Sequence, residues 1–270
     1  MSDQDITSKT KYHVISGRFA GERVASRIIE EQTQEAVDQG HRALQIDAYG
    51  QHGIGGRLWR AGDDPIRIQV TGQPGQRLGS MGFPNTSVEV LGPASDDVGW
   101  LNAGAEIVVH GNAGNGCANA MAQGKVFISG NIGARGMTMT KHNPRFDPPE
   151  LWVLGSAGDY FGEFMAGGIA VICGLDAQNP DNILGYRPFV GMVGGKVFFR
   201  GPHAGYSQPD ARLTTIGDED WNWLDENIRI FLNRIGRNEL IELLSDRNQW
   251  QLLVARTPHE KISRPMRSMQ

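Results

Sequence analysis

The sequence predicts a mainly β protein: a parallel β-helix of about seven coils of roughly 19 residues each, flanked by α-helical elements at both ends. Two observations lead to this prediction. Glycine makes up 36 of the 270 residues, and 31 of these glycines lie between Gly50 and Gly205. The same segment contains a repeat, in which short β-branched or aromatic runs each end in glycine. The terminal glycines are 20, 19, 19, 25, 19 and 27 residues apart.

Each run of the repeat has the composition of a strand that leads into a turn. The runs are 66–72, 88–92, 107–111, 126–130, 151–155, 169–174 and 197–201. Their terminal residues, Gly72, Gly92, Gly111, Gly130, Gly155, Gly174 and Gly201, are predicted structural turn positions, because glycine adopts positive φ without steric cost. The two long spacings indicate insertions around 137–149 and 175–190. A glycine-rich β-sandwich is the alternative, but its strands would recur about every 8–12 residues.

The segment before the repeat has α/β character, and we predict an N-terminal α/β cap over residues 1–62. Val24, Ile28, Ile29 and Val37 recur near helical spacing, and Gly40 stands where a helix C′ glycine belongs. Residues 43–48 alternate like a short strand.

The repeat itself is assigned to residues 63–206, and residues 207–270 are predicted to form a C-terminal helical cap and tail. Asp218 is expected to cap a helix whose apolar stripe runs from Trp221 to Ile235 and which stops at Gly236. A short helix over 238–244, a closing strand over 250–254 and an extended basic tail follow.

Composition and charge exclude several classes of protein. A formal charge of −4 without dense Lys/Arg clusters lacks the electrostatic pattern of a nucleic-acid binder. No apolar run reaches the roughly 18–20 residues of a membrane span. The polar first ten residues lack the apolar region of a secretory signal. With only two cysteines, a reduced cytoplasmic protein without its own cysteine-ligated iron–sulfur cluster is expected.

Four motifs of the repeat carry a resemblance to a known family. They are 75–79 (Gly-Gln-Arg-Leu-Gly), 96–99 (Asp-Asp-Val-Gly), 111–116 (Gly-Asn-Ala-Gly-Asn-Gly) and 158–169, which begins Gly-Asp-Tyr-Phe-Gly. This stretch resembles the GXGXG domain of glutamate synthase large subunits, most closely its stand-alone form, over about residues 66–205. The resemblance implies a right-handed β-helix. The same repeat occurs in the C subunit of formylmethanofuran dehydrogenase and in its formyltransferase/hydrolase relatives.

The insertion at 137–150 is the most unusual segment. It combines Lys141, His142 and Arg145 with prolines that stiffen the loop. We predict a docking or anion-binding loop. The alternative is a loop that only covers one flank, with Arg145 paired to Asp147 or Glu150.

Other candidate motifs favour structural roles. The glycines of 50–56 fail the dinucleotide-loop spacing and predict a turn entering the first coil. Ser80 lacks the G-x-S-x-G pattern of a hydrolase nucleophile. Cys117 and Cys173 are expected to be small core residues.

The remaining polar residues give no metal or catalytic pattern. His110, His142 and His203 are too scattered for a zinc site. Asp96, Asp97 and Asp159 are expected to hydrogen-bond the turning backbone at coil corners. We therefore predict no catalytic, cofactor-binding or metal-binding residues in this chain.

The resemblance implies a non-catalytic β-helix subunit of a glutamate-synthase-like oxidoreductase complex. Such a subunit would brace a glutamine amidotransferase subunit and a synthase subunit, with FMN and iron–sulfur clusters held by the partners and none here. Two alternatives remain. One is the repeat-bearing subunit of a formylmethanofuran dehydrogenase/formyltransferase-hydrolase-like complex, and the other is an autonomous enzyme that uses the 137–150 loop. The substrate and stoichiometry of the complex stay open.

Overall fold

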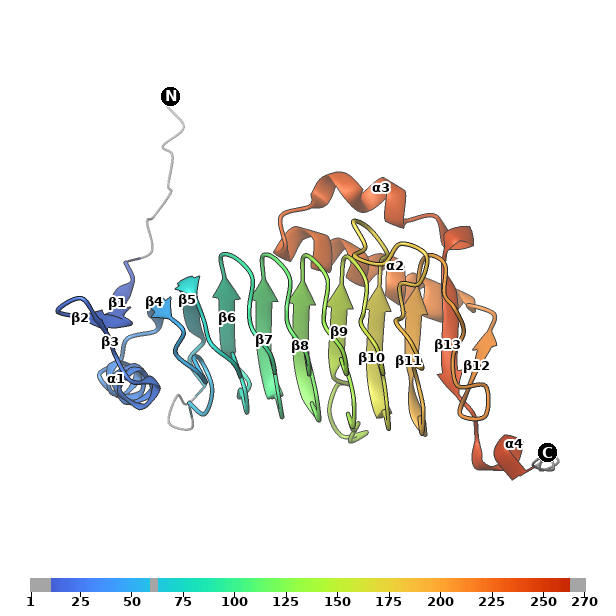
Figure 1. Cartoon of the computed structure of the whole chain (residues 1–270), viewed down its shortest axis with the longest axis horizontal. Helices are drawn as coiled ribbons and strands as arrows, with labels where there is room; N and C mark the ends of the chain where they lie inside the picture. Colours follow the sequence, from blue (N-terminus) through green and yellow to red (C-terminus); the bar gives the residue numbers. More distant parts are fainter. Residues whose placement is uncertain (1–10, 59–62, 263–270) are drawn as a thin grey trace.

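One large sheet dominates the computed structural model, which describes residues 11–58 and 63–262. Eleven strands form it, and a two-stranded hairpin of β2 (Arg18–Phe19) and β3 (Glu22–Arg23) lies beside it. In spatial order the eleven are β1 (His13–Ser16), β4 (Ala43–Tyr49), β5 (Ile66–Gln73), β6 (Thr86–Val90), β7 (Ala103–Val109), β8 (Gln123–Ile128), β9 (Glu150–Val153), β10 (Ala166–Ile172), β11 (Gly194–Phe199), β13 (Gln251–Ala255) and β12 (Ala211–Thr214). Figure 1 shows them side by side along the molecule.

The strands β4 to β11 follow one another in both sequence and space, and every neighbouring pair is parallel. The seven predicted runs are confirmed as β5 to β11. Register keeps the apolar positions aligned: Ile46, Val70, Val90, Val109 and Ile128 are neighbours in successive strands. The period of about 19 residues is therefore the length of chain needed to return to the start of the next parallel strand.

The predicted fold class, a right-handed parallel β-helix, is wrong. The strands form one open, mostly parallel sheet accompanied by a few helices, which is an α/β arrangement, and the sheet is not closed. The segments that return from one strand to the next contribute turns and two isolated bridges, Ala113 with Ile132 and Lys141 with Ala166, instead of further strands. The physical reason lies in their backbone conformation.

Each return segment passes three times through the left-handed region, at alternate residues. Eighteen positions in six repeats share this conformation, with φ between +52° and +72°, and thirteen of them are not glycine. The sets are Arg77/Gly79/Met81, Asp97/Gly99/Leu101, Gly116/Ala118/Ala120, Arg135/Met137/Met139, Tyr160/Gly162/Phe164 and Arg187/Phe189/Gly191. Strands do not use this region, and a non-glycine residue there costs about 1–3 kcal/mol, so the surrounding structure must hold it.

Hydrogen bonds between successive return segments supply that support. The Gly99 amide donates to the Leu78 carbonyl at 2.8 Å, and Ala118 donates to Val98 at 2.7 Å. Met137 continues the series by donating to Cys117 at 2.8 Å. The repeats are thus joined twice, once through the sheet and once through the return segments.

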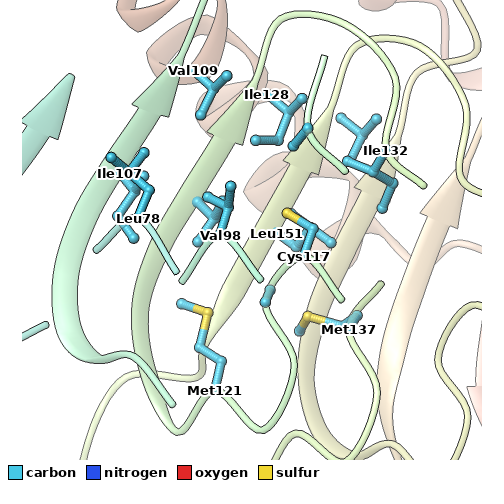
Figure 2. Packing of buried hydrophobic residues seen from close by; sticks show 14 of the residues in the cluster. Leu78, Val98, Ile107, Val109, Cys117, Met121, Ile128, Ile132, Met137 and Leu151 are labelled. Atoms are coloured by element: carbon cyan, nitrogen blue, oxygen red, sulfur yellow. The ribbon is translucent and has the colours of Figure 1, made fainter. Parts of the chain in front are cut away.

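The main hydrophobic core fills the space between the sheet and the return segments. Figure 2 shows Leu78, Val98 and Cys117 from return segments near Ile107 and Ile128 from strands. All five are buried and belong to one cluster. This inner core runs along the sheet and includes residues from β1 to β13.

A second core covers part of the opposite, outer face of the sheet. Helix α2 (Asp218–Arg234) contributes Leu224, Ile228 and Phe231, which pack on outer-face residues such as Phe127 and Trp152. Helix α3 (Ile241–Leu244) adds Leu244. The predicted apolar stripe is confirmed, but α2 lies over the face of the sheet, and the end of the sheet is completed by β13 and β12, which pair antiparallel.

One prediction about the flanks is confirmed and two are corrected. Helix α1 (Ser26–Asp38) and its Gly40 stop are confirmed, with φ of +90° at Gly40. Gly217 occupies the N-cap of α2, so Asp218 begins the helix instead of capping it. The predicted tail contains helix α4 (Pro258–Ile262).

The remaining predictions for the flanks have different outcomes. The predicted short helix is split into a 3₁₀ turn (Asn238–Leu240) and α3. The polar N-terminus predicted over 1–10 and the tail beyond residue 262 lie outside the described residues. The domain boundaries at 62/63 and 206/207 stay predictions.

Candidate interaction surface

The insertion between β8 and β9 places its three cationic or titratable side chains on one exposed loop. The Lys141 amide donates to the Met121 carbonyl at 3.2 Å and joins the loop to the stack. His142 Nε2 lies 3.0 Å from the Phe146 carbonyl, and the Arg145 amide donates to Asn143 Oδ1 at 3.1 Å. The loop therefore has defined geometry, and its docking role stays a prediction.

The ion pair expected under the alternative, between Arg145 and Asp147 or Glu150, is not formed among the described residues. Glu150 is buried, where it pairs with Lys125 Nζ at 3.1 Å and accepts a hydrogen bond from Trp152 Nε1 at 2.9 Å. Within the same described ranges, Asp147 makes no ion pair with Arg145 either. The exposed Arg145 thus keeps its charge available to solvent.

The seven predicted turn glycines fall into two groups. Gly72, Gly174 and Gly201 have φ of +74°, +69° and +138°, as expected for a glycine turn. The other four, Gly92, Gly111, Gly130 and Gly155, do not have positive φ. At Gly130 and Gly155 a side chain is excluded by lack of space. An added Cβ would collide with the Asn112 side chain at Gly130 and with the Asn131 side chain at Gly155, each from the preceding repeat.

An asparagine and aspartate ladder links the corners of successive repeats. Asn112 Oδ1 accepts the Asn131 amide at 2.8 Å, and Asn131 Oδ1 accepts the Ser156 amide at 2.8 Å. Asp96 Oδ1 accepts the Asn115 amide at 2.8 Å. Sequence reasoning missed the asparagines, although the 19-residue spacing of Asn112 and Asn131 was a signal for them.

The prediction that the corner aspartates hydrogen-bond the turning backbone is confirmed for Asp96 and Asp159, and the backbone is that of the following repeat. Asp96 accepts the Asn115 amide and Asp159 accepts the Tyr186 amide, each at 2.8 Å. Asp97 pairs with Arg77 at 3.9 Å. Their role is to hold one repeat against the next.

Both cysteines are core residues, as predicted. Cys117 lies in the inner core and Cys173 in the outer core. Burial raises the pKa of each thiol to about 12, and for Cys173 the Arg200 charge opposes this only in part. A reactive thiolate is therefore not populated at neutral pH.

The other sequence candidates have structural surroundings. Ser80 is buried. His110 Nε2 lies 2.8 Å from Glu89 Oε1, and the His203 ring packs between Phe199 and Tyr206. In the part of the chain that the structure describes, no group of three His, Cys, Asp or Glu side chains is arranged to hold a metal ion.

The predicted turn at 50–56 is confirmed, with positive φ at Gly50, Gly53 and Gly55. Gln51, which sequence reasoning did not single out, is fully buried there, and its amide donates to the Gly17 carbonyl at 2.8 Å and to the Val24 carbonyl at 3.0 Å. This side chain ties the N-terminal flank to the first repeat.

These features define a class of protein: a glycine-rich repeat domain whose polar side chains mainly join one repeat to the next. Within that class, the chain belongs to the GXGXG motif family, whose sequence pattern matches residues 29–254. No helix among residues 11–58 and 63–262 has the length and apolar character required to cross a bilayer.

Two curated proteins are similar to the chain. An uncharacterized protein of Methanocaldococcus jannaschii, MJ1350, is 28% identical over 197 residues, which cover 64% of this chain and 72% of that protein. Ferredoxin-dependent glutamate synthase 2 of Synechocystis is 26% identical over 163 residues. That match covers 56% of this chain and only 9% of the synthase. The chain is thus related to a small part of a ferredoxin-dependent glutamate synthase.

Proposed function

We propose that the chain is a non-catalytic subunit of a glutamate-synthase-like oxidoreductase complex. In this proposal it braces a glutamine amidotransferase subunit and a synthase subunit, and the FMN and iron–sulfur clusters belong to those partners. Membership of the GXGXG family and the similarity to part of a ferredoxin-dependent glutamate synthase support it.

The observation that carries the proposal is the double connection between repeats. Parallel strands from β4 to β11 pair without interruption, and the return segments are hydrogen-bonded to one another as well. Bending such a stack would break hydrogen bonds on one side and compress the close-packed core on the other. A stiff element of this kind suits the task of keeping two active sites at a fixed separation.

Purification of the tagged full-length chain from its own cells tests the proposal. We expect it to co-purify with a second protein that shows FMN and iron–sulfur absorbance, and with a glutaminase activity that resides in a partner. The chain produced alone should show neither flavin absorbance nor turnover of glutamine. Robust glutaminase or reductase activity of the isolated chain would contradict the proposal.

The 137–150 loop provides a control for the autonomous-enzyme alternative. The triple variant Lys141→Ala, His142→Ala, Arg145→Ala changes only exposed side chains, so it should fold normally. If the isolated chain has an activity of its own that this variant loses, the alternative is correct. If the variant only weakens co-purification, the loop is a docking element.

A further inference from the structure

The outward side of the return segments carries a row of apolar residues. In five of the six repeats the third left-handed position is an apolar side chain, in the order Met81, Leu101, Ala120, Met139 and Phe164, and in the sixth it is Gly191. Three of these side chains are well exposed: Leu101 at 38%, Met139 at 56% and Phe164 at 56%. A contiguous exposed apolar strip on a folded domain commonly marks a binding surface.

Backbone hydrogen bonds make this row continuous. The Leu101 amide donates to Asn119, Ala120 to Thr138, and Met139 to Glu163, each partner being the residue directly before the next member of the row. With strands about 4.8 Å apart, five members span roughly 20 Å. The Phe164 amide donates to Val190, so the position after Phe164 is Gly191, which has no side chain, and the apolar row ends at Phe164.

A second row, formed by the first left-handed position of each repeat, lies four residues earlier in the chain and consists of Arg77, Asp97, Gly116, Arg135, Tyr160 and Arg187. The guanidinium carbon of Arg135 lies 5.7 Å from the centre of the Tyr160 ring, and that of Arg187 lies 5.9 Å from the same ring. Two arginines from different repeats thus share one tyrosine. Further along, Arg77 lies 4.9 Å from the Trp100 ring.

The charges of Arg135 and Arg187 are not neutralised by ion pairs within the described residues. Neither guanidinium has a carboxylate of residues 11–58 or 63–262 within ion-pair distance, whereas Arg77 has Asp97 at 3.9 Å. The Asp159 carboxylate, next to Tyr160 in the chain, uses one oxygen to accept the Tyr186 amide. Arginine, tyrosine and tryptophan are the residues enriched at the energetic centres of protein interfaces.

We propose that this face, defined by Leu101, Met139 and Phe164 with Arg135 and Arg187 beside them, is the docking surface for a partner subunit. The partner should present an apolar strip to the first row and carboxylates to the two arginines. A second copy of the chain is a poor occupant, because a two-fold contact would bring the same two arginines of both copies close together. The inference rests on the proposed function in expecting the partner to be the synthase subunit.

Site-specific photocrosslinking in the protein's own cells tests the surface. The crosslinker p-benzoylphenylalanine is placed at Met139 or at Phe164, and at Leu91 as the matched control. Leu91 is 51% exposed but follows β6, away from this face. We expect one identified protein to be crosslinked from Met139 and Phe164 and not from Leu91.

Charge reversal sharpens the test. The double variant Arg135→Glu, Arg187→Glu should abolish the crosslinks and weaken binding of the purified partner at least tenfold. Binding by the unaltered chain should also weaken as salt is raised. Because neither side chain is buried, the thermal unfolding midpoint of the double variant should stay close to that of the unaltered chain.

The outcomes distinguish a failure of the proposed docking surface from a failure of the proposed function. A crosslinked flavin-containing synthase subunit supports both, and a crosslinked acidic protein of another kind supports the surface while removing the proposed function. Crosslinks from Leu91 alone, crosslinked dimers of the chain, crosslinks that survive charge reversal, or no crosslink at any position would each overturn the surface. Co-purification with the synthase subunit would still test the function in that case.

Discussion

The outer face of the sheet has two halves with opposite character. Across β7 to β10, the central row of outward residues is Val108, Phe127, Trp152 and Val171, all buried under the C-terminal helices. Across β4 to β6 the same row consists of Gln45, Gln69 and Glu89. Register continues unbroken between the halves, since Glu89 pairs with Val108.

The inner face shows no such change. There the aligned residues are apolar from Ile46 in β4 through Val109 in β7 to Phe199 in β11. The comparison indicates that the inner core holds the stack together along its whole length, whereas the outer face is specialised locally. The half of the outer face over β7 to β10, the covered half, is stabilised by α2. The half over β4 to β6, the open half, is polar because it is exposed to solvent.

The border between the halves is marked by an ion pair. Arg234, the last residue of α2, donates to Glu106 on β7. Beyond it lies a groove of about 440 Å³ whose lining includes Arg67, Glu89, Glu106 and Arg234. The helix therefore ends where the outer side chains become polar.

The largest effect should come from removing a ring in the covered half. Trp152→Ala should lower the free energy of unfolding by about 3–5 kcal/mol, because a buried aromatic side chain is replaced by a cavity. The Trp152 ring packs 5.5 Å from that of Phe231. Gln69→Ala, in the same row of the open half, should change it by less than about 0.5 kcal/mol. Urea denaturation measures both, and equal losses would contradict the division into halves.

A glutamate in each half gives a smaller contrast. Glu150→Ala should cost about 1–3 kcal/mol, because Trp152 Nε1 then loses its acceptor in the core. Glu89→Ala breaks a partly exposed contact with His110 and should cost at most about 1 kcal/mol. Chemical denaturation of the two variants is the measurement. A larger loss of unfolding free energy for Glu89→Ala than for Glu150→Ala would contradict the solvent exposure of the half over β4 to β6.

The border pair should contribute less again. A double-mutant cycle with Arg234→Ala and Glu106→Ala should give a coupling free energy of about 0.2–1 kcal/mol, since both side chains are about one-third exposed. The Arg229–Asp225 pair, which lies within α2, is the control. A zero coupling energy for Arg234 and Glu106 would remove the pair as an anchor of α2.

The last effect is of similar size to that of the border pair, concerns the end of the covered half and depends on pH. Burial acts to raise the pKa of Asp210, but hydrogen bonds from Ser207, the Gly191 amide and Lys261 outweigh it, so the pKa lies below its usual 3.8. A lowered pKa stabilises the fold at pH above 3.8, and this contribution is lost as pH falls through the folded-state value. Asp210→Asn should therefore cost up to about 1 kcal/mol at pH 7.

Urea denaturation between pH 7 and pH 3 measures this difference. The unaltered chain and the Asp210→Asn variant should approach one another as pH falls. A difference that grows in acid would show that the carboxylate is not stabilising.

Much of the repeat was predictable from the sequence because side-chain alternation records which face of a strand is buried. The runs that became β5 to β11 illustrate this, as does the stripe of α2. The return segments were not predictable, because residues such as Arg135, Met137 and Met139 adopt left-handed conformations against their intrinsic preference. Because non-glycine residues also adopt that conformation, the glycine pattern alone does not predict the fold class.

The candidate surface was likewise predictable from the sequence only in part. The sequence singled out the loop of Lys141, His142 and Arg145, but it could not show that Arg135 and Arg187, 52 residues apart, share the ring of Tyr160. That proximity depends on the lateral stacking of repeats, including an insertion between them.

By itself, the sequence determined the period, the strands and the apolar inner face, because each of these depends on residues that are neighbours along the chain. Only the tertiary structure decided that one sheet stays open, that α2 covers half of its outer face, and that non-glycine residues turn through the left-handed region. Those outcomes depend on contacts between distant segments: the hydrogen bonds between return segments offset the backbone strain, and the outer core of β7 to β11 selects where the helix lies.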